Sequence, residues 1–269
     1  MRSLWAQWPQ LHQAIAHADY LALFLDFDGT LVPIARHPAH VHLPNATRHL
    51  LQQLQQLPRM SVALVSGRAL RDVQACVGLE RLYYVGNHGL EIAGSSLRYV
   101  HPAAWRHRKL LRQVARDLRL AVRSIRGAWV EDKRYTLSLH WRLVPTSAHR
   151  LLHRRVGQVL ASPLRKQAIR VTRGKRVIDI RPPVNWHKGD AALRLLRHVS
   201  RMSRGVRLLP IYVGDDQTDE DAFRLLRRTG LTLRVGHPAQ RSAAQYYVEN
   251  PQGVLRFLRR LRQMRLAHD

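Results

Sequence analysis

The chain has 269 residues, 45% of them hydrophobic, and a formal net charge of +27 at pH 7. An apolar fraction of this size supports a sizeable core and excludes a globally disordered chain. No apolar run reaches the ~20 residues that a membrane span needs. The N-terminal segment Met1–Tyr20 lacks the continuous apolar centre of a signal peptide, so we expect a cytoplasmic protein without a membrane partner. Cys76 is the only cysteine, which excludes an internal disulfide and a cysteine metal site.

Short apolar runs of the kind found in buried parallel sheets recur along the chain, each followed by a turn signal. Helical patterns lie between several of them. This alternation predicts right-handed crossovers and a doubly wound α/β core with a parallel sheet. The expected strands are Leu21–Leu25, Met60–Val65, Leu82–Val85, Leu208–Val213 and Leu231–Val235, and the expected helices are Asn45–Leu57, Ala69–Val77, Lys188–Met202, Asp219–Arg228 and Pro251–Leu266.

The middle of the chain follows a different pattern, in the order helix, hairpin, helix, hairpin. We interpret residues 101–182 as a small inserted α/β cap domain with a four-stranded antiparallel sheet and two helices. It interrupts a catalytic core made of residues 1–100 and 183–269, between the third and fourth main strands. The expected helices are Ala104–Arg123 and Ser147–Leu160, and the expected strands are Trp129–Glu131, Tyr135–Trp141, Ile169–Thr172 and Arg176–Arg181.

Two carboxylates follow the first predicted strand directly. Asp26 and Asp28 stand two residues apart in the run Phe24-Leu25-Asp26-Phe27-Asp28-Gly29-Thr30. Ligands bind at the carboxyl ends of parallel strands, so both side chains should emerge at the binding edge of the sheet. An ordinary strand-to-turn Asp-Gly is the alternative reading of this segment alone.

Two further segments could hold a phosphoryl group. Ser66-Gly67-Arg68 ends the second predicted strand, and a hydroxyl with backbone N–H groups at a helix start suits phosphate oxygens. Lys188 opens the helix after the insert and could neutralise the same group. Each is weak alone, because serine caps many helices and a helix-start lysine is often simply solvated.

An acidic run follows the fourth core strand, in a chain with only 18 acidic residues. It is Gly214-Asp215-Asp216-Gln217-Thr218-Asp219-Glu220-Asp221. Clustered carboxylates at a strand end suit Mg²⁺, which prefers hard oxygen ligands. The same residues also suit a helix N-terminus, and both can hold, with Asp215 on the metal and Thr218–Asp221 beginning the helix.

These four elements, in this order, resemble the haloacid dehalogenase superfamily of phosphotransferases, and the resemblance covers the whole core. It implies a magnesium-dependent phosphatase that forms an aspartyl-phosphate. In that chemistry Asp26 is the nucleophile and Asp28 the general acid and base. The resemblance also implies that Asp26, the backbone carbonyl of Asp28, and Asp215 bind the metal. It implies that Ser66, Gly67 and Lys188 bind the phosphoryl group. Asp219 or Asp216 would orient a metal-bound water or Lys188 from outside the set of metal ligands, and spacing does not decide which of the two does so.

Two more segments make the resemblance narrower. Gly86-Asn87-His88-Gly89 follows the third core strand, and Glu131-Asp132-Lys133 leads on to His140-Trp141-Arg142 in the insert. With the core they are similar to trehalose-6-phosphate phosphatases over about Leu21 to Leu261. Two residues depart from the family pattern: Asp179 stands where Glu is usual, and Ser66 where Thr is usual. The implied sugar contacts are Arg68, Asn87, His88, Glu131, Lys133, Arg142 and Asp179.

The expected function is therefore hydrolysis of the small sugar phosphate trehalose 6-phosphate to trehalose and phosphate. One alternative keeps the mechanism and changes the substrate, to sucrose phosphate or a mannosyl-phosphoglycerate. Another alternative is a basic nucleic-acid-binding protein built on the same core, since a net charge of +27 favours an anionic partner. No nucleic-acid motif is recognised and aromatic residues are only 7%, so we expect no nucleic-acid partner and interpret the charge as a property of composition.

Overall fold

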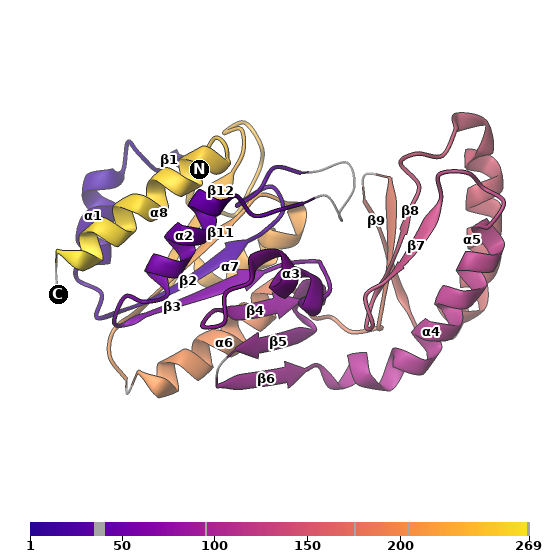
Figure 1. The fold of residues 1–269 in the computed structure, drawn as a ribbon, viewed down its shortest axis with the longest axis horizontal. Helices are drawn as coiled ribbons and strands as arrows, with labels where there is room; N and C mark the ends of the chain where they lie inside the picture. Colours follow the sequence, from indigo (N-terminus) through magenta and orange to yellow (C-terminus); the bar gives the residue numbers. More distant parts are fainter. Residues whose placement is uncertain (35–40, 95, 175, 204, 268–269) are drawn as a thin grey trace. The chain divides into compact units, whose positions relative to one another are not determined.

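The computed structural model describes residues 1–34, 41–94, 96–174, 176–203 and 205–267 (Figure 1). The chain divides into two compact units. The first comprises Met1–Tyr99 with Trp186–Asp269, and the second is the continuous segment Val100–Asn185. Among the described helices, none is long and apolar enough to cross a membrane.

The first unit is built on a nine-stranded sheet, with β2 and β11 at its centre. Neighbouring strands from β1 to β4 run parallel, and β5 turns back antiparallel to β4. The fold class is thus the α/β sheet that the strand–helix alternation predicts. In spatial order the strands are β1 (Arg2–Ser3), β13 (Tyr246–Val248), β12 (Leu231–Val235), β11 (Leu208–Gly214), β2 (Tyr20–Asp26), β3 (Met60–Val65), β4 (Tyr83–Gly86), β5 (Glu91–Gly94) and β6 (Leu97–Val100).

Helices cover both faces of this sheet, which explains why its central strands are apolar throughout. Along β2, Leu21, Leu23 and Leu25 join one buried cluster, and the alternate residues Ala22 and Phe24 join another. The first cluster contains residues of α1 (Trp8–Ala16), α2 (Asn45–Leu54), α3 (Leu70–Val77) and α8 (Pro251–Leu266), and the second contains residues of α6 (Lys188–Met202) and α7 (Glu220–Leu226).

The strand register brings the predicted motifs to one edge of the sheet. Leu25 of β2 pairs with Val213 of β11, and Asp26 pairs with Val65 of β3. The segments that follow these strands therefore leave the sheet at the same level. Position on the sheet, rather than proximity in sequence, assembles the candidate site.

The second unit is a four-stranded antiparallel sheet with two helices, as the sequence predicts. Ile178 and Ile180 of the sheet are buried with Leu111, Leu118 and other helical residues, so both helices cover one face. The strand order is β7 (Trp129–Asp132), β8 (Leu137–His140), β10 (Val177–Arg181) and β9 (Arg170–Gly174), and the helices are α4 (Pro102–Val122) and α5 (His149–Arg165), the latter preceded by the 3-10 turn Thr146–Ala148.

All five predicted core strands are present, but the sequence did not predict β1, β5, β6 and β13. β1 has two residues, too few for any periodicity. β13 has three residues, again too few to show a periodicity. Helix α1 was also missed, because its apolar residues alternate with Gln and His.

Candidate active site

A buried lysine joins two carboxylates at the carboxyl edge of the sheet. The Lys188 ammonium donates to Asp26 Oδ1 at 2.6 Å and to Asp219 Oδ1 at 2.9 Å. All three residues are at most 3% exposed. A lysine at the first position of a helix is opposed by the helix dipole, and here two carboxylates offset that cost.

The start of α6 is fixed independently of the site. His187 and Asp190 form a capping box, in which the Asp190 carboxylate accepts from the His187 backbone N–H at 2.8 Å. This cap determines where the helix begins and hence where Lys188 emerges.

Both carboxylate oxygens of Asp219 accept hydrogen bonds from neighbouring protein groups. Its Oδ1 accepts from the Tyr212 hydroxyl at 2.8 Å as well as from Lys188, and its Oδ2 accepts from the Asp216 backbone N–H at 3.1 Å. Asp216 is exposed, and its side chain caps the short 3-10 turn Gln217–Asp219. The structure thus separates two residues that spacing left equivalent: Asp219 contacts Lys188, and Asp216 shapes the turn.

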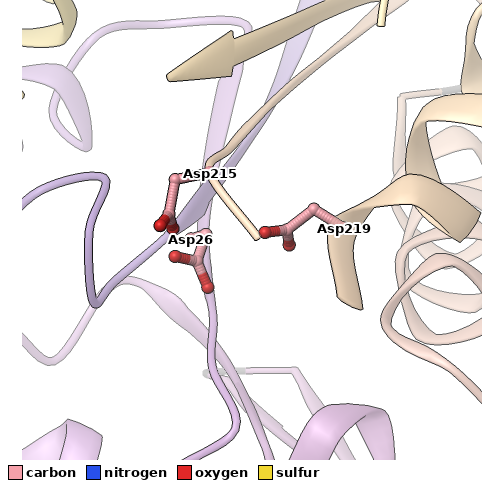
Figure 2. Close-up of side chains that lie close together, drawn as sticks. All are labelled: Asp26, Asp215 and Asp219. Atoms are coloured by element: carbon pink, nitrogen blue, oxygen red, sulfur yellow. The ribbon is translucent and has the colours of Figure 1, made fainter. Parts of the chain in front are cut away.

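Asp26, Asp215 and Asp219 form a compact carboxylate group (Figure 2). One oxygen from each lies within 4.8 Å of the others. Asp26 and Asp215 turn their carboxylates toward each other, and Asp219 approaches from the start of the helical segment. Burial, followed by the charge of Asp219, raises the pKa of Asp215 to about 6.

The same crowding acts on the other two charged groups. Burial raises the pKa of Asp26 well above its ordinary value, although Lys188 opposes the effect. Burial alone would lower the pKa of Lys188, but the charges of Asp219 and Asp26 outweigh it and raise that pKa. Three carboxylates around one ammonium leave negative charge uncompensated, so these residues fit a hard divalent cation.

Asp28 is held by a guanidinium fork. Arg68 donates through Nε to Asp28 Oδ2 and through a terminal nitrogen to Oδ1, each at 2.7 Å. The guanidinium also lies over the Phe27 ring, 5.4 Å from its centroid. This bidentate geometry fixes the plane of the Asp28 carboxyl group more tightly than a lysine could.

The Ser66-Gly67-Arg68 segment packs against the turn that carries His88. Ser66 is buried, and its hydroxyl oxygen accepts from the Arg68 backbone N–H at 3.1 Å. A Cβ on Gly67 would come within 2.4 Å of the His88 ring, so only glycine lets the imidazole lie there. The glycine of this motif is therefore needed for the position of a neighbouring candidate residue.

Asn87 is fully buried and bonded within the core. Its side-chain amide donates to Glu91, and its backbone N–H donates to the Arg68 carbonyl at 2.7 Å. Asn87 and His88 both adopt positive φ, which Asn tolerates better than most residues. A direct sugar contact from Asn87 does not follow from this placement, whereas a role in shaping the His88 turn does.

In the second unit, Glu131 lies within a polar group on the sheet face that the helices leave uncovered. His140 Nε2 and Glu131 Oε2 are 2.7 Å apart, and the Lys133 ammonium is 3.9 Å from the same oxygen. The Trp129 ring stacks on His140 with centroids 4.0 Å apart. The result is an ordered set of donors and acceptors beside an aromatic surface.

Asp179 lies on the same face and has a partner within the sheet. It accepts a hydrogen bond from the Ser138 hydroxyl, and Ser138 pairs across the ladder with both Asp179 and Glu131. Arg142 is exposed just beyond the end of β8. The Asp179 side chain therefore reaches a neighbouring strand of its own sheet.

The sequence model of a protein family described as trehalose-phosphatase matches residues 24–252. The chain belongs to the trehalose-phosphatase family. Membership in this family makes the protein a phosphatase, consistent with the carboxylate and lysine cluster described above.

Named members of the trehalose-phosphatase family cover nearly the whole chain. A trehalose-phosphate phosphatase of Mycobacterium tuberculosis is 37% identical over 97% of this chain and 68% of its own length. A probable trehalose-phosphate phosphatase of Oryza sativa is 32% identical over 97% of this chain and 75% of its own. The C-terminal domain of a Candida albicans trehalose-6-phosphate phosphatase has the same fold, with a TM-score of 0.79, 22% identity and coverage of 95% and 96% of the two chains.

Two contacts of the candidate residues, one in each unit, were not predicted from the sequence. Tyr212 lies inside a buried strand, where its hydroxyl is not distinguished from the apolar run around it. His140 was noted within a motif but not as a partner of Glu131. The sequence signal for Tyr212 was a hydroxyl-bearing residue within the buried strand that leads into the acidic run.

We predict that Gly29→Ala inactivates and destabilises the protein. Gly29 has φ +87, and a Cβ there would lie 2.2 Å from the Asp215 carboxylate. Positive-φ strain and the displaced carboxylate should cost about 1–3 kcal/mol and most of the activity. Gly157→Ala is the matched control, because nothing lies within 4 Å of its Cβ and the position is helical. Thermal unfolding with a phosphatase assay measures both, and equal behaviour of the two variants would contradict the prediction.

We predict that Tyr212→Phe lowers kcat by about tenfold with little change in KM, because Asp219 loses one of the donors that orient it toward Lys188. Tyr84→Phe is the control, since this buried tyrosine donates to the Leu79 carbonyl at 2.6 Å, away from the site. Both variants should lose about 1 kcal/mol of stability. Steady-state kinetics with chemical denaturation separates the effects, and a similar fall of kcat in Tyr84→Phe would refute the assignment.

Proposed function

We propose that the protein hydrolyses trehalose 6-phosphate to trehalose and inorganic phosphate, as a step of trehalose synthesis. The supporting observation is the buried Asp26–Lys188–Asp219 array, with Asp215 beside it, in a chain of the trehalose-phosphatase family. A cytoplasmic location remains a prediction from the sequence.

Asp26 is the proposed nucleophile. A carboxylate oxygen of Asp26 attacks phosphorus, the bond from phosphorus to the sugar oxygen breaks, and an aspartyl-phosphate forms. Lys188 holds the Asp26 carboxylate in place from one side, through Oδ1. The buried position of Asp26 also keeps bulk water away from the reacting group.

Asp28 is the proposed acid and base. Its carboxyl group gives a proton to the departing sugar oxygen, and the resulting carboxylate later takes a proton from the water that hydrolyses the aspartyl-phosphate. Arg68 fixes the location of this group through the two hydrogen bonds described above. The cycle returns Asp26 as a carboxylate and releases phosphate.

Lys188, the Ser66 hydroxyl and the backbone at Gly67 are the proposed phosphoryl-binding groups. Asp26, Asp215 and the backbone carbonyl of Asp28 are the proposed holders of Mg²⁺. When bound, the cation would neutralise charge on the carboxylates and on the phosphoryl oxygens. Asp219 is not proposed as a metal ligand, because its carboxylate oxygens already accept hydrogen bonds from Lys188, Tyr212 and the Asp216 backbone.

We propose sugar contacts from residues of the second unit and, independently, from residues of the first. Glu131 and Lys133 are proposed to bind sugar hydroxyls, since charged groups and an imidazole beside an aromatic face suit a disaccharide. Arg68, His88 and Arg142 are further proposed contacts. Asp179 is proposed to order Ser138 and the neighbouring strand.

Asp26→Asn is expected to reduce phosphate release from trehalose 6-phosphate by about four orders of magnitude or more, because an amide is a poor nucleophile. Asp19→Asn is the control, since Asp19 is exposed just before the opposite end of the same strand. EDTA should abolish the wild-type activity and Mg²⁺ restore it. Mg²⁺ should also raise the melting temperature of wild type more than that of Asp215→Asn.

These measurements distinguish the open alternatives. Release from an aryl phosphate, sucrose phosphate or a mannosyl-phosphoglycerate, but not from trehalose 6-phosphate, would keep the mechanism and reject the substrate. Full activity of Asp26→Asn would reject the mechanism itself.

Glu131→Gln is expected to lower kcat/KM for trehalose 6-phosphate by about 10–100-fold, because a charged hydrogen-bond acceptor for the sugar is lost. The rate with an aryl phosphate, which has no disaccharide, should change by less than about twofold. Asp117→Asn on α4 provides a charge-matched control in the same unit. A parallel loss on both substrates would show that Glu131 acts on the fold of the unit rather than on the sugar.

A further inference from the structure

Positive charge is concentrated in the second unit rather than spread evenly over the chain. Residues 100–185 carry 21 of the 45 lysines and arginines but only 4 of the 18 acidic residues. The larger first unit holds the remaining 24 cations and 14 anions. A compositional bias acting on the whole chain would not produce this difference between the two units.

Within the second unit the charge lies in its helical layer. We define the arginine layer as residues 102–126 and 149–166, which hold 13 lysines and arginines and the single acidic residue Asp117. Eleven of these cations are arginines. On α4 and the turn after it, exposed cations recur every three or four residues, which places them along one side of the helix. They are Arg106, Lys109, Arg112, Arg116, Arg119 and Arg123.

Carboxylates do not neutralise this stripe. In the part of the chain that the structure describes, no ion pair involves any of its six cations. Asp117 instead accepts from the Gln113 side chain at 2.8 Å. On the opposite face of the sheet, by contrast, Lys133 lies beside Glu131. The positive field of the layer therefore faces solvent.

A hollow of about 400 Å³ lies between α4 and α5 at one end of the stripe. Arg123, Arg155, Ser124 and Gln158 are among its lining residues. The Arg155 guanidinium is already ordered, since it donates to the Ala121 carbonyl at 3.1 Å and to the Ser124 hydroxyl at 2.8 Å. A pre-ordered guanidinium loses less entropy when it binds an anion.

We propose that the arginine layer binds the phosphodiester backbone of nucleic acid without reading its bases. Guanidinium groups suit phosphate oxygens in forked geometry, and a row of them along a helix forms an electrostatic track for a polyanion. The layer covers the sheet face opposite to Glu131 and Asp179, so it is separate from the proposed sugar contacts. It is an additional surface and does not depend on the catalytic assignment.

The test compares two triple variants of the full-length protein. Arg112→Gln, Arg119→Gln and Arg123→Gln together remove three exposed cations of the arginine layer. The control removes three exposed cations of the first unit, as Arg197→Gln, Arg201→Gln and Arg259→Gln. Both change the net charge equally. Both should retain phosphatase activity and melting temperature, which shows that they are folded.

Binding is measured by fluorescence anisotropy with labelled oligothymidylate and with a random-sequence duplex of equal length, across a salt series. The layer variant should bind both at least about tenfold more weakly at low salt, with a salt slope shallower by about three on the duplex and by about two on the single strand. The control variant should differ from wild type by less than about twofold. Equal weakening in both variants, or no wild-type binding at low salt, would overturn the proposal.

Two competing probes identify a different polyanion. Polyglutamate stands in for an acidic protein, and vesicles containing anionic lipid stand in for a membrane. If either binds the wild type more tightly than the oligonucleotides do, and the layer variant loses that binding, the surface is one for acidic protein or lipid and the nucleic-acid proposal fails.

Discussion

The Lys188 ammonium is the interaction on which the site depends. It is buried, and it holds the last residue of β2 against the first turn after β11 through Asp26 and Asp219. A buried cation of this kind is stable only with its carboxylates, and the carboxylates only with it. The capping box at the start of α6 fixes the position of the Lys188 backbone, and the Tyr212 hydroxyl holds Asp219, one of the two partners of Lys188. The geometry of the candidate site and the stability of the core therefore depend on the same contacts.

Glycines allow these groups to approach so closely. A Cβ on Gly29 would overlap Asp215, and one on Gly214 would come within 2.4 Å of the Asp219 carboxylate. Gly67 similarly lies under His88. The glycines of the motifs thus provide the space in which the carboxylates that follow different strands meet.

The sequence predicted the parts of the fold that rest on local patterns. The buried strands that end at Asp26 and just before Asp215 were recognisable because each apolar run stops at a carboxylate, and parallel pairing then brings these ends together. The different roles of Asp216 and Asp219 were not predictable, because they depend on which side chain contacts Lys188 in the folded chain. The contact of Tyr212 was not predictable for a related reason, because its hydroxyl meets the Asp219 carboxylate only once the chain is folded.

The interruption of the core also affects how the protein is made. The central strand pair joins β2 to β11, and Asp26 meets Lys188 across 162 positions of the chain. While the chain is being synthesised, β2 lacks this neighbour until the whole second unit has emerged. That unit is continuous in sequence and pairs its strands only with one another, so it is expected to fold before the core that flanks it. In the meantime an apolar strand edge stays open, and an open edge of this kind favours aggregation of the nascent first half.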